Sequence, residues 1–239
     1  MHFRVLTSKI VATVRERGVA SATRAVGRHL WRKLRATPLD NFDRRHGTDT
    51  SGEVALWETR DSSVRVRFGV RYQASREGDL VQAVNSLGID ARNFTFIDLG
   101  CGKGRTLLVA ARLGFRQAIG IEIAAELADI ARANLAKLDV TNALVIHGDA
   151  AEYVFPSGGL VVYLYNPFGA PVMSHVVREL EHRIEHGESD EVYVVYMEPT
   201  CGPLLDQSRF LRRVSTAHDF EHVAIWKGTG RLPALLAGS

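Results

Sequence analysis

The spacing of apolar and polar residues divides this chain into parts with different expected structures. Between residues 3 and 34, apolar side chains recur at roughly helical spacing with arginines and lysines between them. This pattern predicts one or two amphipathic helices, interrupted near Gly18. Residues 38–52 are rich in Asp, Asn, Gly and Ser, which favour turns, so we expect a loop and a domain boundary there.

From residue 93 onward, short apolar runs alternate with longer stretches of helical periodicity. We predict strands at 94–99, 117–123, 143–147, 160–165 and 191–197, and helices at 104–113, 124–137 and 172–186. Two more strands, 210–217 and 221–227, have no long helix between them and are expected to form an antiparallel pair. Nearly continuous apolar strands that alternate with helices predict an α/β, doubly wound, mostly parallel sheet with helices on both faces. Before this core, an extended segment is predicted at 65–72 and a short helix at 79–87.

The charge of the chain is concentrated at its N-terminus. The net charge is +3, yet residues 1–35 carry +8 and the remainder carries −5. We expect this basic helical arm to pack on the main domain or on a second subunit as a homodimer contact. Attachment to an anionic membrane surface is the alternative. The main domain is not expected to bind nucleic acid, since its net charge is negative.

The chain has two cysteines, no apolar run of about 20 residues and no signal-peptide pattern. These features predict a cytoplasmic protein, peripheral to a membrane only if the arm attaches it there.

The first strand of the core runs into a turn with three glycines, in Asp98-Leu-Gly-Cys-Gly-Lys-Gly104. In a parallel α/β sheet, glycines in this turn let the backbone approach a bound cofactor closely. Arg105 stands where the Gly-x-Gly-x-x-Gly pattern of nicotinamide and flavin sites needs its third glycine. A phosphate-binding P-loop is also disfavoured, because Gly104 follows Lys103 where Ser or Thr would be required.

Acidic residues follow three successive predicted strands. Asp98 ends the first strand, Glu122 ends the second, 22 residues after Gly100, and Asp149 follows the third. A carboxylate at the second position can accept hydrogen bonds from two ribose hydroxyls, and one at the third can accept from an adenine amino group. The three acids together predict a cofactor that contains adenosine.

These residues resemble the class I S-adenosylmethionine (SAM)-dependent methyltransferase superfamily over about residues 93–227. The resemblance makes 98–104 the first motif, Glu122 and Ile123 the acidic loop, and Asp149 and Ala150 the adenine-binding position. It implies SAM as the cofactor and a seven-stranded sheet that ends in an antiparallel hairpin. It further implies that Gly100, Cys101, Gly102 and Gly104 line the cofactor and that Asp98 helps to hold its ammonium group.

The fourth predicted strand ends in Asn166-Pro-Phe-Gly169. This stretch is similar to the Asn/Asp-Pro-Pro-Tyr motif of amino-group methyltransferases, although Phe168 and Gly169 replace the second proline and the tyrosine. The similarity implies that Asn166, beside the cofactor, and the carbonyl of Pro167 orient an acceptor nitrogen, with the Phe168 ring packed against it. A plain turn with a core phenylalanine is the alternative interpretation.

Tyr72-Gln-Ala-Ser75 is similar to a Tyr-x-Pro-Thr/Ser segment of protein-lysine methyltransferases that lack a SET domain, with Ala74 in place of the proline. The similarity implies that Tyr72 folds over the methionine end of the cofactor; an edge-strand tyrosine is the alternative. We therefore divide the chain into a helical arm (1–37), a linker and cofactor lid (38–92) and a SAM-binding core (93–239).

These interpretations together predict methyl transfer to a nitrogen of a protein lysine or a small-molecule amine. Oxygen methylation of a sugar, lipid or other small molecule is the first alternative, and a SAM-binding module without catalysis is the second. His182 and His186 match a His-x-x-Glu-His zinc pattern. We interpret them as a solvated helix face and expect no metal.

Overall fold

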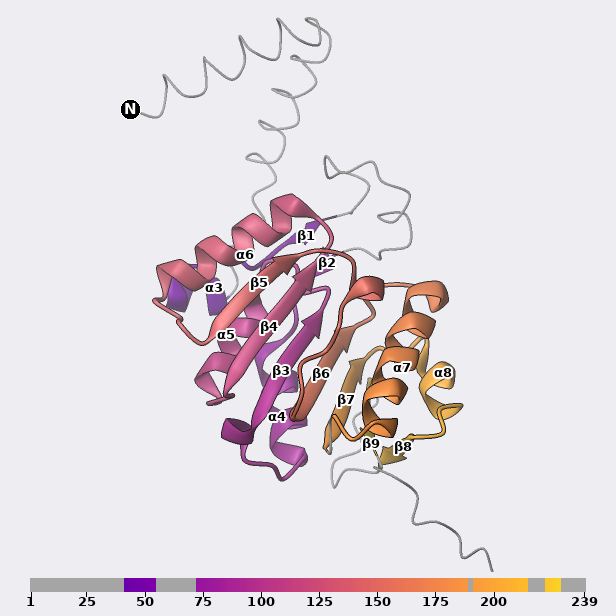
Figure 1. Ribbon diagram of the computed structural model, residues 1–239. Helices are drawn as coiled ribbons and strands as arrows, with labels where there is room; N and C mark the ends of the chain where they lie inside the picture. The colour runs from indigo at the N-terminus through magenta and orange to yellow at the C-terminus, as the bar shows by residue number, and fades with distance from the viewer. Residues whose placement is uncertain (1–40, 55–71, 189–190, 215–221, 229–239) are drawn as a thin grey trace, which may run out of the picture. The chain divides into compact units, whose positions relative to one another are not determined.

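The computed structural model describes residues 41–54, 72–188, 191–214 and 222–228 (Figure 1). The predicted helical arm of residues 1–37 lies outside these ranges. So does the predicted extended segment 65–72, apart from its last residue.

A seven-stranded sheet forms the centre of the described structure (Figure 1). The strands are β3 (Phe94–Leu99), β4 (Gln117–Glu122), β5 (Ala143–His147), β6 (Gly159–Tyr165), β7 (Val192–Met197), β8 (Leu211–Val214) and β9 (Val223–Gly228). Their order in the sheet is β5-β4-β3-β6-β7-β9-β8. The first five are parallel, whereas β9 runs antiparallel to both β7 and β8. The predicted mostly parallel sheet with an antiparallel closing pair is therefore confirmed.

Helices cover both faces of this sheet, as the doubly wound prediction requires (Figure 1). One face packs against α4 (Glu77–Ser86), α5 (Arg105–Arg112) and α6 (Ala125–Lys137), and the other against α7 (Ala170–Glu185) and α8 (Gly202–Asp206). Alternation along β3 explains the two layers: Phe94 and Phe96 point to the first face, Ile97 and Leu99 to the second. Asp98 has the parity of Phe96 and therefore lies on the side of α5.

The order of the strands changes direction at β3. β3 pairs with β4 on one side and with β6 on the other. The chain therefore adds β4 and β5 on one side of β3 and then crosses back to place β6 and β7 on the other side. In open α/β sheets a ligand binds outside the carboxyl ends of the strands at such a switch point. The ends of β3, β4 and β6 therefore mark the place to search for a site.

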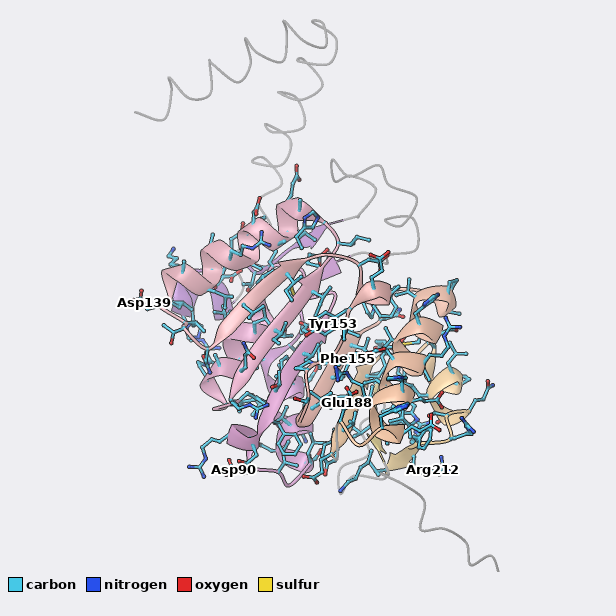
Figure 2. All side chains as sticks on the ribbon, in the orientation of Figure 1. Asp90, Asp139, Tyr153, Phe155, Glu188 and Arg212 are labelled. Carbon is cyan, nitrogen blue, oxygen red and sulfur yellow. The ribbon has the colours of Figure 1, made fainter. Side chains whose placement is uncertain are left out.

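The connection from β5 to β6 contains only the short 3-10 helix η4 (Ala150–Glu152). Two aromatic rings follow it, Tyr153 and Phe155, which meet edge to face with 5.3 Å between their centroids (Figure 2). Phe155 is buried in the same core cluster as α7. Leu144 and Ile146 on the neighbouring edge strand remain more than one-third exposed.

Two short helices differ from the predictions. Residues 38–52 were expected to form a loop, but α3 (Asn41–His46) begins there and is followed by β1 (Glu53–Val54), which pairs antiparallel with β2 (Tyr72–Gln73). Phe42 is 4% exposed and packs in the core cluster that also holds α4, so tertiary contacts stabilise a helix too short to show periodicity. α8 lies at residues for which no helix was predicted. None of the helices in the described ranges has the length and apolarity that a bilayer crossing requires.

Candidate active site

The turn between β3 and α5 has a backbone that only glycine adopts easily. Gly100, Gly102 and Gly104 have φ angles of 95°, 54° and 80°, all in the left-handed range. A Cβ at Gly100 would lie 2.6 Å from Cβ of Pro167, and one at Gly104 would lie 3.0 Å from Cβ of Ala131. The three glycines therefore allow both the turn and its close contact with the end of β6.

Glu122 holds this glycine turn from the neighbouring strand. Its Oε2 accepts a hydrogen bond from the backbone amide of Gly102 at 2.8 Å, and its Oε1 accepts one from the amide of Ala124 at 2.8 Å. The side chain is buried, and this burial raises its pKa above the ordinary glutamate value. Each carboxylate oxygen has a second lone pair, so Glu122 retains acceptor capacity for ribose hydroxyls.

Asp98 lies beneath the turn, 3% exposed, and accepts a hydrogen bond from the Thr106 hydroxyl in the first turn of α5. Burial raises its pKa to about 7, with a smaller contribution from the negative charge of Glu122. A cation bound beside Asp98 would stabilise the charged carboxylate. This environment suits a partner for an ammonium group.

The third predicted acid lies in the turn after β5. Asp149 is half-buried and its Oδ1 accepts a hydrogen bond from the amide of Ala151 at 2.9 Å, which caps η4. Nearby, Nε2 of His147 lies 3.1 Å from the carbonyl oxygen of Ile123 and links the ends of β4 and β5. Ile123 and Ala150 are therefore in two adjacent turns at the carboxyl edge of the sheet.

The turn after β6 brings Asn166 and Pro167 to the same edge. Asn166 has a φ of 43°, and its Oδ1 accepts a hydrogen bond from the hydroxyl of Thr200, which follows β7. Pro167 contacts the glycine turn at Gly100. Phe168, by contrast, is 7% exposed and belongs to the core cluster beneath α7, in agreement with the alternative of a core phenylalanine.

Tyr72 lies in β2 by its backbone, where it pairs with Val54. The placement of its side chain is outside the described structure, so its proposed role over the methionine end stays a prediction.

Two titratable residues lie near the turn that contains Asn166, one at the end of β6 and one directly after β7. Tyr165 ends β6, and its pKa is raised by burial and by the charge of Glu198. Glu198 directly follows β7, and its Oε1 lies 3.4 Å from Nδ1 of His222. In the sequence, Glu198 begins the segment 198–203, which follows a predicted strand and suggests either part of an acceptor pocket or a plain turn.

The structure also describes Cys101 in the glycine turn and the two histidines of the predicted zinc pattern. The Cys101 thiol is buried, and its pKa is raised well above the ordinary value by burial and by Asp98 and Glu122, so it stays neutral. His182 and His186 are exposed and stack on each other on α7, with 4.1 Å between ring centroids. In the described ranges, no three His, Cys, Asp or Glu side chains come together as a metal site.

The arrangement fits SAM. Three glycines allow close backbone approach, Asp98 offers a buried carboxylate for the ammonium group, and Glu122 and Asp149 follow the next two strands where the ribose and adenine would bind. SAM would supply a methyl group on a sulfonium, which is already a strong electrophile. The residues of the chain then have to bind, orient and exclude water.

Comparison with known proteins agrees with this geometry. Residues 96–187 match the family described as methyltransferase domain. The chain is 37% identical over 135 residues to a ribosomal protein L11 methyltransferase of Hamiltonella defensa subsp. Acyrthosiphon pisum. That match covers 52% of this chain and 44% of the relative, so the chain spans less than half the length of the curated relative.

The fold is shared with a solved structure described as the putative methyltransferase yhhF from Escherichia coli, which has a TM-score of 0.52 at 16% identity, covering 75% of this chain and 100% of that one. An RNA methyltransferase from Salinibacter ruber, solved with S-adenosyl-L-homocysteine (SAH), has a TM-score of 0.47 at 21% identity, covering 69% and 99%. The match over residues 96–187 contains the glycine turn and the acids at the carboxyl edge of the seven-stranded sheet, and together these features support the class I SAM-dependent methyltransferase superfamily for this part of the chain.

Proposed function

We propose that the chain transfers the methyl group of SAM to a nitrogen atom, of a protein lysine or of a small-molecule amine. The observation that carries this proposal is the contact between Pro167 and Gly100, where an added Cβ would lie 2.6 Å from the proline Cβ. This contact brings Asn166 beside the turn that would hold the methionine end of SAM. An amide at that point can orient a nitrogen lone pair toward the methyl group.

The chemistry requires little from the protein beyond positioning. Methyl transfer is an in-line displacement, so a neutral amine has to be held in line with the sulfur–methyl bond and away from water. The Oδ1 of Asn166 is oriented by the Thr200 hydroxyl and has a second lone pair for an N–H of the acceptor. The carbonyl of Pro167 is the second candidate acceptor for such an N–H.

The similarity to a ribosomal protein L11 methyltransferase favours a protein among the nitrogen acceptors. Since the chain corresponds to 44% of that relative, the similarity supports the class of acceptor and not its identity.

Oxygen methylation is the second candidate, and the pair formed by Glu198 and His222 favours it. A hydroxyl acceptor needs a general base, and a carboxylate 3.4 Å from an imidazole nitrogen is such a group. Glu198 directly follows β7, which pairs with β6, and Asn166 directly follows β6.

The test is transfer of radiolabelled methyl from SAM into a lysate, followed by size fractionation and by acid and base hydrolysis of the labelled product. Label that resists base hydrolysis and appears on an amine supports nitrogen methylation. Label on a hydroxyl supports the second candidate. SAH binding without transfer of label to any fraction would indicate a SAM-binding module without catalysis and would contradict both methylation candidates. The variant Asn166→Ala tests the amide in the same transfer assay. Ser174→Ala is its matched control, because the Ser174 hydroxyl donates to the carbonyl of Ala170 within α7.

A further inference from the structure

The segment Asn41–Ser51, here called the docking segment, folds around one buried carboxylate. Asp43 is fully buried and accepts hydrogen bonds from the hydroxyls of Thr48 and Thr50, at 2.6 and 2.7 Å, and from the amide of Thr50 at 2.9 Å. The amide of Ser51, at 2.6 Å, and its hydroxyl also donate to Asp43. A single side chain therefore determines the path of residues 48–51.

Asp43 is charged in this environment. Burial alone raises its pKa, but the hydrogen bonds from Ser51, Thr48 and Thr50 outweigh that effect and hold the pKa at about 2. The guanidinium of Arg105 lies 3.8 Å from Oδ2 of Asp43 and supplies a compensating positive charge. A buried ion with this many partners fixes the local structure tightly.

The docking segment binds the two basic residues that flank Gly104 in the glycine turn. Nζ of Lys103 donates to Oδ1 of Asp49 at 2.7 Å and to the carbonyl of Ser51 at 2.9 Å. Nε of Arg105 donates to the Thr50 hydroxyl at 2.8 Å. Both side chains are less than one-tenth exposed, so their charges are directed at this segment and not at solvent.

Asn134 on α6 completes the connection. Its Oδ1 accepts from the amide of Asp49 at 3.0 Å, while its Nδ2 donates to the carbonyls of Asp49 at 2.9 Å and Lys103 at 3.0 Å. The amide side chain therefore joins the docking segment, the glycine turn and α6. Glu122 holds the same turn through the amide of Gly102. The turn is thus held both from β4 and from the docking segment.

A turn in which three alternate residues are left-handed glycines has a high conformational entropy when it is not held. Ligand affinity then depends on how much of this entropy the protein has already removed before the cofactor arrives. Apart from Phe42, the buried apolar residues of the two core clusters lie outside the docking segment. Loosening the contacts is therefore expected to reduce ligand affinity more than it reduces global stability.

We propose that the docking segment is part of the cofactor site, in which Asp43, Thr50 and Arg105 act as positioning residues that hold the glycine turn ready for SAM. This inference rests on the proposed function, because it presupposes that SAM binds at the turn. It assigns a role to residues 41–51, which belong to the part of the chain before the core and outside the family match at 96–187.

The test uses Thr50, whose hydroxyl both donates to Asp43 and accepts from Arg105. In the full chain, Thr50→Val removes the hydroxyl and keeps the shape, whereas Thr50→Ser keeps the hydroxyl. SAH affinity measured by calorimetry is expected to fall roughly 10-fold in Thr50→Val and to stay within about 3-fold of wild type in Thr50→Ser. Asp43→Asn, which removes acceptor capacity for five donors, is expected to lose roughly 100-fold.

Glu77→Gln is the matched control. It removes the ion pair from Glu77 to Arg45, at 3.2 Å, which joins α3 to α4, and the pair to Arg112, which joins α4 to α5. Neither pair involves a residue of the glycine turn. Its SAH affinity is expected to stay within about 2-fold of wild type. Without ligand, amide hydrogen exchange of residues 99–106 should be faster in Thr50→Val than in wild type and unchanged in Glu77→Gln. A general loss of stability would not confine the faster exchange to these residues.

The outcomes separate the inference from the proposed function. Absence of SAH binding by the folded wild-type chain would overturn the proposed function and this inference with it. Wild-type binding together with unchanged affinity and exchange in Thr50→Val would overturn the inference alone. Equal losses in Thr50→Val and Thr50→Ser would also overturn it, because the hydroxyl would then not be the cause.

Discussion

Glu122 accepts a hydrogen bond from the backbone amide of Gly102, with 2.8 Å between Oε2 and nitrogen, although 20 residues separate them. Through Oε1 the same carboxylate accepts from the amide of Ala124, at the start of α6. One buried acid therefore couples the turn after β3 to the turn after β4. The sequence had suggested Glu122 as a ribose ligand; the structure adds that it shapes the turn beside the ribose position.

This double role predicts a large effect of Glu122→Gln. Glutamine keeps the shape but has one acceptor oxygen and introduces an NH₂ group that cannot accept from either amide. We expect SAH affinity to fall roughly 10- to 100-fold, since hydrogen bonds to a charged group contribute about 1.5–3 kcal/mol each. Calorimetry measures the affinity. Asp129→Asn, which removes an exposed pair with Arg132, is the control and should bind SAH normally; an equal loss in both variants would contradict the role of Glu122.

The contact of Gly100 with Pro167 predicts a specific cost for Gly100→Ala. The new Cβ would meet the proline at 2.6 Å and would also require a φ of 95°. Gly114→Ala separates the two effects, because Gly114 has a φ of 82° and no heavy atom within 4 Å of an added Cβ. We expect Gly114→Ala to lose about 1 kcal/mol of unfolding free energy and Gly100→Ala to lose about 2–4 kcal/mol. Chemical denaturation measures the unfolding free energy. Equal losses in Gly100→Ala and Gly114→Ala would show that the contact with Pro167 adds no cost.

The raised pKa of Asp98 predicts a pH dependence. The pKa of Asp98 in the folded protein, about 7, lies above the ordinary aspartate value of 3.8. Between pH 3.8 and about pH 7 the folded protein without ligand therefore keeps a proton on Asp98 that the unfolded chain has released. The stability associated with this group is therefore present below pH 4 and is lost as pH rises through about 7. Ligand binding should act in the opposite direction, because the ammonium group favours the charged carboxylate.

We therefore expect SAH binding to release a proton near pH 6.5. Calorimetry in buffers with different ionisation enthalpies measures that proton. Asp98→Asn should abolish the release. The same release in the variant would assign the proton to another group.

The hydrogen bond between Thr200 and Asn166 predicts separate effects on binding and on catalysis. Thr200→Val removes the hydroxyl that orients the Asn166 amide but leaves the glycine turn and its acids unchanged. SAH affinity should remain within about 2-fold of wild type. The value of kcat for methyl transfer should fall roughly 10-fold, the effect of misplacing a reacting group. Loss of SAH affinity equal to the loss of kcat would show that Asn166 belongs to the cofactor half of the site.

The parts that could be predicted from the sequence are those encoded by neighbouring residues. Apolar runs and helical spacing placed β3 at its observed limits, and the glycines marked a backbone that L side chains rarely adopt. The docking segment could not be predicted in this way, because its contacts join Asp49 to Asn134, 85 positions later. α3 was missed because six residues do not establish a helical period, and a buried Phe42 shows its partners only after folding. The position of β9 between β7 and β8 likewise depends on pairing, not on spacing.

Calorimetric titration of the full chain with SAH, SAM and NAD, for wild type and Gly102→Val, tests the central claim most directly. Gly102 has a φ of 54° and donates its amide to Glu122, so a branched side chain there should disrupt the turn. We predict that wild type binds SAH and SAM but not NAD, and that folded Gly102→Val loses at least about 100-fold in SAH affinity. Preference for NAD, or unchanged SAH affinity in Gly102→Val, would contradict a SAM site at the glycine turn.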